Sequence, residues 1–111
     1  MTTFKKWDIV LVPFPFTDLT STKKRPALVV SPDDYNAGSD LVLAFLTSNV
    51  GGPRQIGDLE LIQWRESGLP LPTKLRMKFA TVSRAIVLKK LGEIHHSDRT
   101  AVSRRLLQFF Q

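Results

Sequence analysis

Side chains that could bind phosphate occur in three separate parts of the chain. A loop that begins with PFPF ends in three consecutive cations, which are Lys23, Lys24 and Arg25. An apolar run ends in two hydroxyls and an amide, which are Thr47, Ser48 and Asn49. A later segment carries cations at every second position, which are Lys74, Arg76 and Lys78. Cationic and hydroxyl donors surround phosphates in proteins, so these residues predict a phosphate-binding site if the three segments meet in space.

Three apolar runs predict the strands that would carry the first two groups. Residues 8–14, 26–31 and 40–48 are rich in Val, Ile and Leu and are bounded by Pro, Asp and Ser, as buried strands are. Residues 13–25 then form the loop between the first two strands, and residues 31–39 form a turn before the third. On one rim of a small barrel, the loop end and the third strand end would lie close together.

The second half of the chain is predicted to add two more strands. Residues 57–64 alternate like a half-buried strand, and the prolines at positions 70 and 72 keep residues 68–73 extended. Residues 74–82 alternate cations with apolar side chains, and this period of two places the three cations on one face of a strand. The sequence therefore predicts a basic stripe next to the phosphate-binding segments.

A single helix is predicted at the C-terminal end. Residues 85–94 are ambiguous between helix and strand, and Gly92 suggests a break. Ser97 is the expected N-cap, with Asp98 in the first turn, and an apolar face at helical spacing follows, which consists of Val102, Leu106 and Phe109. About five short strands followed by one helix predict a mainly β fold, a small and strongly bent antiparallel barrel.

Composition limits the classes of partner. The 111 residues predict a single domain, 1–111, and 16 Lys and Arg against 10 Asp and Glu give a formal charge of +6 and a pI of about 10.1. Such a charge favours a polyanionic partner, either nucleic acid or an acidic peptide. The chain has no cysteine, which excludes disulfides and cysteine-based metal sites. Neither a signal peptide nor a run of ~20 apolar residues is recognised, so we expect a cytoplasmic protein without membrane contact.

Each of these features also has an ordinary structural interpretation. Cations beside a strand are usually solvated, hydroxyls at a strand end often form turns, and a basic stripe can be a wet sheet face. The two histidines, at positions 95 and 96, precede a helix and lack further ligands at metal-binding spacing. Trp7, Tyr35 and Trp64 could stack on bases, although packing is their commoner use.

The order of motifs resembles the PemK and MazF family of toxin ribonucleases. The opening WDIVLVPFPFTDLTSTKKRPALVVS is similar to the start of that family, in which an Arg-Pro pair leads into an apolar strand, here RPALVV from Arg25. FLTSN resembles the family's Thr-Ser strand end, and SGLPLPT resembles its segment before the fifth strand. RMKFATV resembles the strand that ends in a threonine, here Thr81. The resemblance covers nearly the whole chain in order.

The resemblance implies a fold, a reaction and partners. It implies an SH3-like barrel with a C-terminal helix, a homodimer with single-stranded RNA bound across its interface, and a cognate antitoxin protein that blocks that cleft. The implied reaction is sequence-selective cleavage of messenger RNA without metal or cofactor. The ribose 2′-hydroxyl attacks the adjacent phosphate and leaves a 2′,3′-cyclic phosphate and a 5′-hydroxyl.

The same resemblance assigns roles to individual residues. Arg25 matches the family's catalytic arginine, Thr47 its hydroxyl partner, and Arg76 a second arginine that some members carry. The remaining candidates are interpreted as substrate-binding, and they are Lys23, Lys24, Ser48, Asn49, Arg54, Lys74, Lys78 and Thr81.

The general base is the point where the chain departs from its relatives. Some of them carry an acidic residue two positions after the later arginine, where this chain has Lys78, and some use a histidine in the first loop, where this chain has none. Asp18 is a substitute within that loop. Two other functions therefore stay open on the same fold: a CcdB-like inhibitor of DNA gyrase, and an RNA-binding module that does not cleave.

Overall fold

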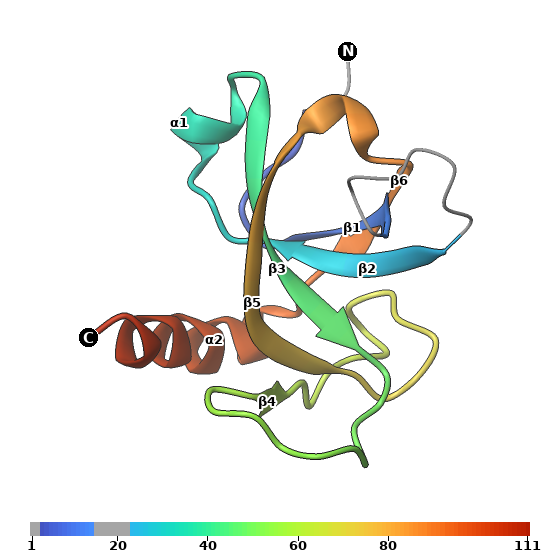
Figure 1. Ribbon diagram of the computed structural model, residues 1–111, viewed down its shortest axis with the longest axis vertical. Coiled ribbons are helices and arrows are strands. Elements are labelled where there is room, and N and C mark those ends of the chain that lie inside the picture. The colour runs from blue at the N-terminus through green and yellow to red at the C-terminus, as the bar shows by residue number, and fades with distance from the viewer. Residues whose placement is uncertain (1–2, 15–22) are drawn as a thin grey trace.

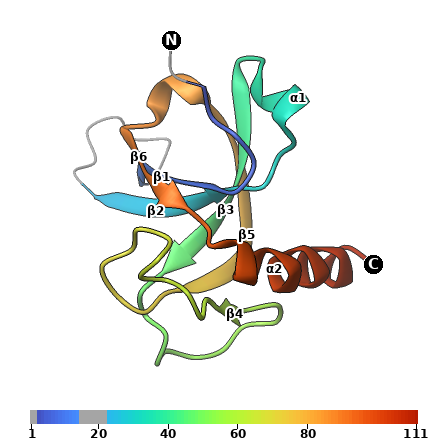
Figure 2. The ribbon, with the colours of Figure 1, turned by 180° about the vertical axis from the view of Figure 1, so that it is seen from behind.

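The computed structural model describes residues 3–14 and 23–111 (Figure 1). Its strands form one curled antiparallel sheet in the order β4-β5-β3-β2-β1-β6. The strands are β1 (Asp8–Pro13), β2 (Lys24–Val29), β3 (Asp40–Thr47), β4 (Leu59–Glu60), β5 (Lys74–Ser83) and β6 (Lys89–Glu93). Seen from behind, the sheet curls around its own axis and α2 (His96–Phe109) lies against one end of it (Figure 2). The predicted class, mainly β with a C-terminal helix, is confirmed.

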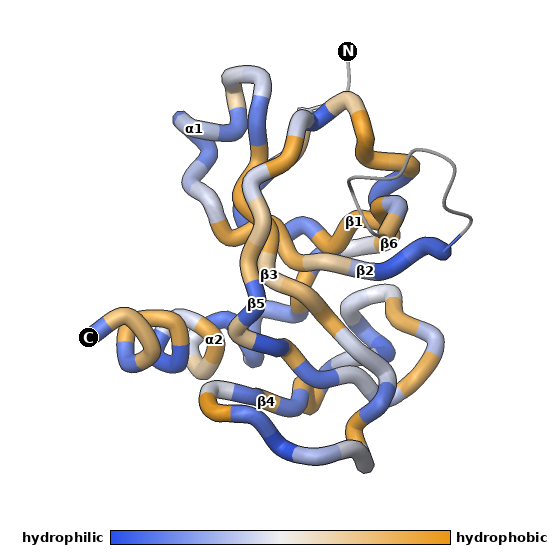
Figure 3. The backbone as a smooth tube through the Cα atoms, viewed as in Figure 1, coloured by the Kyte–Doolittle hydropathy of each residue, from blue (hydrophilic) through white to orange (hydrophobic). Residues whose placement is uncertain are grey.

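Side chains on the two faces of the central strands enter two separate cores. On β3, Leu41 and Leu43 pack into one core, whereas Ala44 and Leu46 pack into the other, and all four are buried. Because both faces of these strands are covered, β2 and β3 appear in the sequence as nearly continuous apolar runs. The orange stretches of β1, β2 and β3 in Figure 3 trace these runs, and the outer loops are mostly blue or pale.

Two short helices occupy the connections. The turn predicted at residues 31–39 contains α1 (Asp33–Asn36), a single helical turn. The buried Asn36 side chain donates to the Ser31 carbonyl at 3.0 Å, and the Val42 N–H donates to the Ser31 hydroxyl at 3.0 Å. These bonds satisfy polar groups where the chain enters β3. A 3₁₀ turn, η1 (Arg84–Ile86), follows β5 in the segment whose structure was ambiguous.

Helix α2 begins two residues earlier than the sequence predicted. Its N-cap is His95, whose Nδ1 accepts from the Ser97 N–H at 3.3 Å, so the assignment of Ser97 as N-cap was wrong. Asp98 lies in the first turn, as predicted, but it is buried and accepts hydrogen bonds from the segment after β4. In the described part of the chain, no helix is long and apolar enough to cross a bilayer.

The buried carboxylate of Asp98 explains why the strand predicted at residues 57–64 shrinks to β4. It accepts from the Gln63 N–H at 2.8 Å and from the Ile62 N–H at 3.3 Å. If β4 continued, the Gln63 N–H would face β5, as the Leu61 N–H does where it donates to the Thr73 carbonyl at 3.0 Å. Instead, the chain turns under the helix N-terminus, where a carboxylate is electrostatically favourable.

The break predicted before residue 95 is present, since β6 ends at Glu93 and α2 begins at His96, but Gly92 itself lies inside β6. A Cβ atom at position 92 would overlap the carbonyl oxygen of Ser67, and one at Gly68 would come within 2.5 Å of the Leu91 carbonyl. Two backbone segments therefore touch here, and the glycine serves close approach instead of chain termination.

We expect Gly92→Ala to destabilise the protein by about 1–3 kcal/mol, because the backbone of β6 must move away from Ser67. The free energy of unfolding from urea titration measures this loss. Gly51→Ala is the matched control, since its Cβ would meet no atom within 4 Å. Equal urea midpoints for the two variants would contradict the packing argument.

Candidate active site

Arg25 and Thr47 lie at the ends of two neighbouring strands. The last pair between β2 and β3 is Ala27 with Phe45, and Arg25 and Thr47 each lie two residues beyond that pair. Both side chains line a cavity of about 190 Å³, which we call the strand-end cleft. The cleft is lined by Lys24, Arg25, Pro26, Leu46, Thr47, Ser48, Leu69, Pro70, Leu71 and Thr73. The structure thus brings together two of the three segments that the sequence singled out.

A row of side chains extends from this cleft across four strands. The residue opposite Thr47 on β5 is Lys74, and the residue opposite Lys74 on β4 is Glu60. Cross-strand partners project to the same face of a sheet. Arg25, Thr47, Lys74 and Glu60 therefore share one face, at the end of the sheet where β4 is attached.

Phe14 holds two cations near the cleft. Its ring centroid lies 5.8 Å from the guanidinium carbon of Arg25 and 5.6 Å from Nζ of Lys78. The same ring packs edge-on against Phe45, with 5.7 Å between the ring centroids. Cation–π contacts and this aromatic pair fix the ring between β2, β3 and β5. The sequence alone indicated no contact between Phe14 and these cations.

The base of the first loop is closed by a backbone hydrogen bond. The Phe14 N–H donates to the carbonyl of Lys23 at 2.9 Å, so the two ends of the loop lie next to each other beside Arg25. Asp18, the substitute base suggested by the sequence, lies outside the described residues.

The predicted basic stripe is wrong for Lys74, which is buried instead of facing solvent. Its Nζ lies 3.1 Å from Oδ2 of Asp58, and each of these two side chains is only 4% exposed. Nη2 of Arg76 lies 3.3 Å from the same oxygen. The period of two did place the cations on one face, but the loop before β4 returns over that face and supplies a carboxylate. Of the three cations, only Lys78 is exposed.

Asp58 connects three parts of the chain. Its Oδ2 also accepts from the Gln55 N–H at 3.0 Å, and its carbonyl accepts from Nη1 of Arg105 on α2 at 2.5 Å. Burial raises the pKa of Asp58, but the hydrogen bonds from Gln55, Lys74 and Arg76 outweigh it and hold the pKa below its ordinary value of 3.8. Sequence reasoning missed this residue because its cationic partners Lys74, Arg76 and Arg105 are 16 to 47 positions away and no local pattern marks it.

An irregularity in β5 sets the directions of the later cations. Ala44 pairs with Phe79 and Leu46 pairs with Leu75, so residues 76–78 all lie opposite Phe45. Such a bulge bends the strand and redirects side chains. Here the bulged stretch contains both Arg76, which contacts Asp58, and Lys78, which contacts Phe14.

The remaining candidates are spread more widely. Lys23, Lys24 and Asn49 are exposed at the strand ends, and the Asn49 N–H donates to Oγ1 of Thr47 at 3.1 Å. Thr81 pairs with Val42, in the half of β5 that leads away from the cleft, so the structure does not bring it to the site.

Among the other aromatic and histidine residues, Trp7 and Trp64 pack against the core, and Tyr35 is exposed on α1. His95 and His96 stack on each other with 4.3 Å between ring centroids, at the start of α2. None of these five side chains lines the strand-end cleft.

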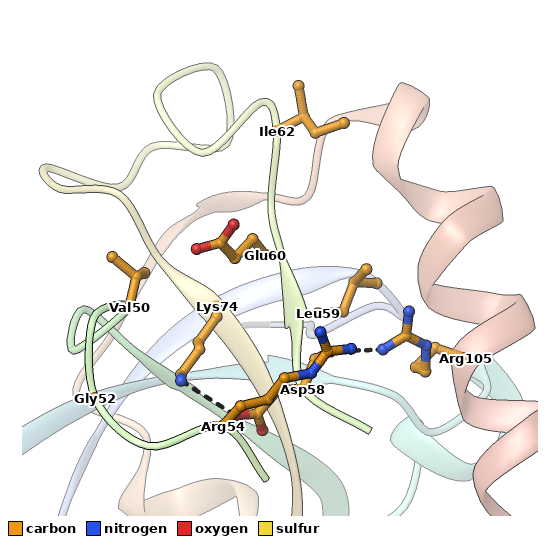
Figure 4. A pocket seen from close by; sticks show the side chains of 9 residues that line it. All are labelled: Val50, Gly52, Arg54, Asp58, Leu59, Glu60, Ile62, Lys74 and Arg105. Atoms are coloured by element: carbon orange, nitrogen blue, oxygen red, sulfur yellow. Dashed lines mark hydrogen bonds and ion pairs between the residues drawn. The ribbon is translucent and has the colours of Figure 1, made fainter. Parts of the chain in front are cut away.

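A second cavity, of about 460 Å³, adjoins the buried ion pairs, and we call it the loop cavity (Figure 4). In the figure, dashes join Lys74 to Asp58, Glu60 projects from β4 towards the side of Val50, and Arg105 enters from α2 opposite. The cavity is lined by Val50, Gly52, Arg54, Asp58, Leu59, Glu60, Ile62, Lys74 and Arg105. Arg54, a predicted substrate-binding residue, therefore lies here and not in the strand-end cleft.

Fold and site together define a small curled β-sheet protein with a basic, hydroxyl-bearing cleft at its strand ends. A family model described as "PemK-like, MazF-like toxin of type II toxin-antitoxin system" matches residues 5–110. The protein belongs to this family. The expected family membership is therefore confirmed.

Solved structures show the same fold at low sequence identity. An endoribonuclease from Mycobacterial species, in complex with its cognate antitoxin, superposes with a TM-score of 0.72 at 17% identity, covering 97% of this chain and 93% of that one. A second endoribonuclease from Mycobacterial species gives 0.72 at 19% identity, with 97% and 91% covered. The Mycobacterium tuberculosis toxin MazF-mt6 gives 0.72 at 15% identity, with 93% and 95% covered. No curated protein matches the chain.

Proposed function

We propose that this toxin is a sequence-selective endoribonuclease that cleaves single-stranded messenger RNA without a metal ion. The observation that carries the proposal is that Arg25 and Thr47 line the strand-end cleft together. The net charge of +6 and the family membership support it, as does the similarity in fold to two endoribonucleases. A fixed cation and a hydroxyl at one phosphate are suited to phosphoryl transfer.

The proposed reaction uses the nucleophile of the substrate. The ribose 2′-oxygen forms a bond to the adjacent phosphorus, the bond from phosphorus to the 5′-oxygen breaks, and a cyclic phosphate results. The 2′-hydroxyl loses its proton, and the departing 5′-oxygen gains one. DNA lacks the 2′-hydroxyl, so this reaction leaves it intact.

Three residues carry the proposed chemistry. The guanidinium of Arg25 stabilises the additional negative charge of the phosphorane, and the hydroxyl of Thr47 hydrogen-bonds a phosphate oxygen or the 2′-oxygen. Arg76 is proposed to add a second guanidinium through Nη1, since Asp58 engages its Nη2 and its Nε is buried. No described residue that lines the cleft is a carboxylate or a histidine, so we assign the proton acceptor to none of them.

The exposed cations and polar side chains around the cleft are proposed to bind the RNA backbone. Such contacts make affinity fall steeply with salt concentration. The residues are Lys23, Lys24, Ser48, Asn49 and Lys78 at the cleft, with Arg54 in the loop cavity.

A homodimer and an antitoxin complete the proposal. Apolar side chains are exposed near the end of α2, where the ring of Phe79 stacks with Phe109 and Phe110, and Phe110 is 70% exposed. Ile56 is 89% exposed. Such surface favours burial against a second copy. A basic cleft that binds RNA also suits the acidic segment of a cognate antitoxin, and we place the pair in the cytoplasm.

The test is incubation of purified, antitoxin-free protein with a long single-stranded RNA in EDTA, with DNA of the same sequence as control. We expect discrete cuts with 2′,3′-cyclic phosphate and 5′-hydroxyl ends in RNA only. Salt-sensitive RNA binding without cuts would instead identify a silent binding module. If the protein neither cleaves nor binds RNA but inhibits DNA gyrase, the CcdB-like function is indicated.

A further inference from the structure

The loop cavity lies directly beside the proposed catalytic residues. Thr47 pairs with Lys74, and Lys74 pairs with Glu60, so Glu60 is two strand spacings, about 10 Å, from Thr47. The chain that leaves Thr47 reaches the cavity wall at Val50, three residues later. A nucleotide whose phosphate lies at Thr47 can therefore extend its base, or that of its neighbour, into this cavity.

The cavity wall combines the three kinds of group that a nucleotide needs. Val50, Leu59 and Ile62 form an apolar surface, and Ile62 is 79% exposed although it is a large aliphatic side chain. Such a surface can contact the flat face of a base. Cations from two sides, Arg54 and Arg105, can reach a phosphate.

Glu60 is the hydrogen-bond acceptor that this cavity presents to a ligand. Its side chain is exposed and has no ion pair or hydrogen bond within the described part of the chain, and Figure 4 shows it projecting from β4 towards the side of Val50, among the residues that line the cavity. Asp58, the other carboxylate, is buried and bound to Lys74 and Arg76. The Glu60 carboxylate repels phosphate and favours a ligand group that offers hydrogen-bond donors.

We propose that the loop cavity binds a nucleobase that flanks the cleaved phosphate and that Glu60 selects a base with an exocyclic amino group. Guanine, adenine and cytosine carry such a group, and their N–H donors match a carboxylate acceptor. Uracil presents carbonyl oxygens in its place, which the carboxylate repels. This inference rests on the proposed ribonuclease function and adds the residue that reads one position of the cleavage motif.

The test compares Glu60→Gln with the wild-type protein on RNAs that vary at single positions around a mapped cut. The wild-type protein is expected to cleave the amino-bearing bases about 5- to 150-fold faster than uracil at one flanking position. In Glu60→Gln this ratio should fall below about threefold, because an amide can both donate and accept. Glu66→Gln is the matched control, since Glu66 is an exposed acid outside the cavity.

Each outcome separates this inference from the proposed function. Loss of discrimination in Glu60→Gln alone, with cleavage of the preferred RNA retained, supports the inference. An unchanged motif in Glu60→Gln overturns it and leaves the proposed ribonuclease function intact. If the wild-type protein cleaves no RNA, fluorescent hexanucleotides that differ in one base decide: Glu60-dependent preference against uracil supports the base site, and equal binding overturns it.

Discussion

Arg25→Ala is expected to slow RNA cleavage by about 10²–10³-fold, the loss that follows removal of one donor to a developing oxyanion. Arg25 lies at the end of β2 and lines the strand-end cleft with Thr47, and its side chain is exposed. Stability should therefore change by no more than about 0.5 kcal/mol, because the substitution leaves no buried group unpaired. Initial rates on a short RNA with a single mapped cut measure the effect.

Two further variants identify what Arg25 contributes. Arg25→Lys keeps the charge but loses the planar pair of donors, so it should recover only part of the rate. Lys24→Ala removes a neighbouring exposed cation and should mainly weaken binding and its dependence on salt. Wild-type rates in Arg25→Ala, under conditions where the substrate saturates the enzyme, would remove Arg25 from the mechanism.

The sequence predicted the strands well where the pattern of apolar residues, alternating or continuous, indicates which side chains are buried. The runs at β1, β2 and β3 correspond to strands buried on both faces, a signal that depends only on local composition. The predicted strand at 57–64 failed because the N–H groups of Ile62 and Gln63 bond to Asp98, 35 residues further on. Partners at such separation leave no trace in a local window.

The candidate site was predicted in part: the sequence predicted features that depend on local strand patterns and missed those that depend on distant segments. Arg25 and Thr47 lie just beyond the paired ends of β2 and β3, so their meeting in the cleft follows from the strand positions. The stripe failed at Lys74 because its surroundings are set by Asp58, a residue of the preceding loop. The alternation of residues along a strand predicts to which face of the sheet a side chain points. Whether that side chain is exposed depends on which other segments cover that face.

Asp58→Ala is expected to destabilise the fold by about 3–5 kcal/mol, because it leaves the ammonium group of Lys74 buried and unpaired. Lys74 is only 3% exposed, and Asp58 also holds Arg76 and the loop that returns over β5. Urea titration measures the loss, and Glu66→Ala, which removes an exposed acid, should change stability by no more than about 0.5 kcal/mol. The double variant Asp58→Ala/Lys74→Met removes both charges and should recover much of the lost stability.

Acidification tests the same ion pairs without changing the buried volume. The pKa of Asp58 is lowered in the folded protein, so as pH falls the unfolded chain takes up its proton first. The contribution of Asp58 is therefore fully present above about pH 4 to 5, and it is lost as pH falls through the lower pKa of the folded state. Below pH 4 the wild-type protein should lose stability more steeply than Asp58→Ala/Lys74→Met. Two results would contradict this account: the same dependence of stability on pH in both proteins, or an Asp58→Ala variant as stable as the wild type. Either would show that Asp58 does not stabilise the buried ammonium group of Lys74.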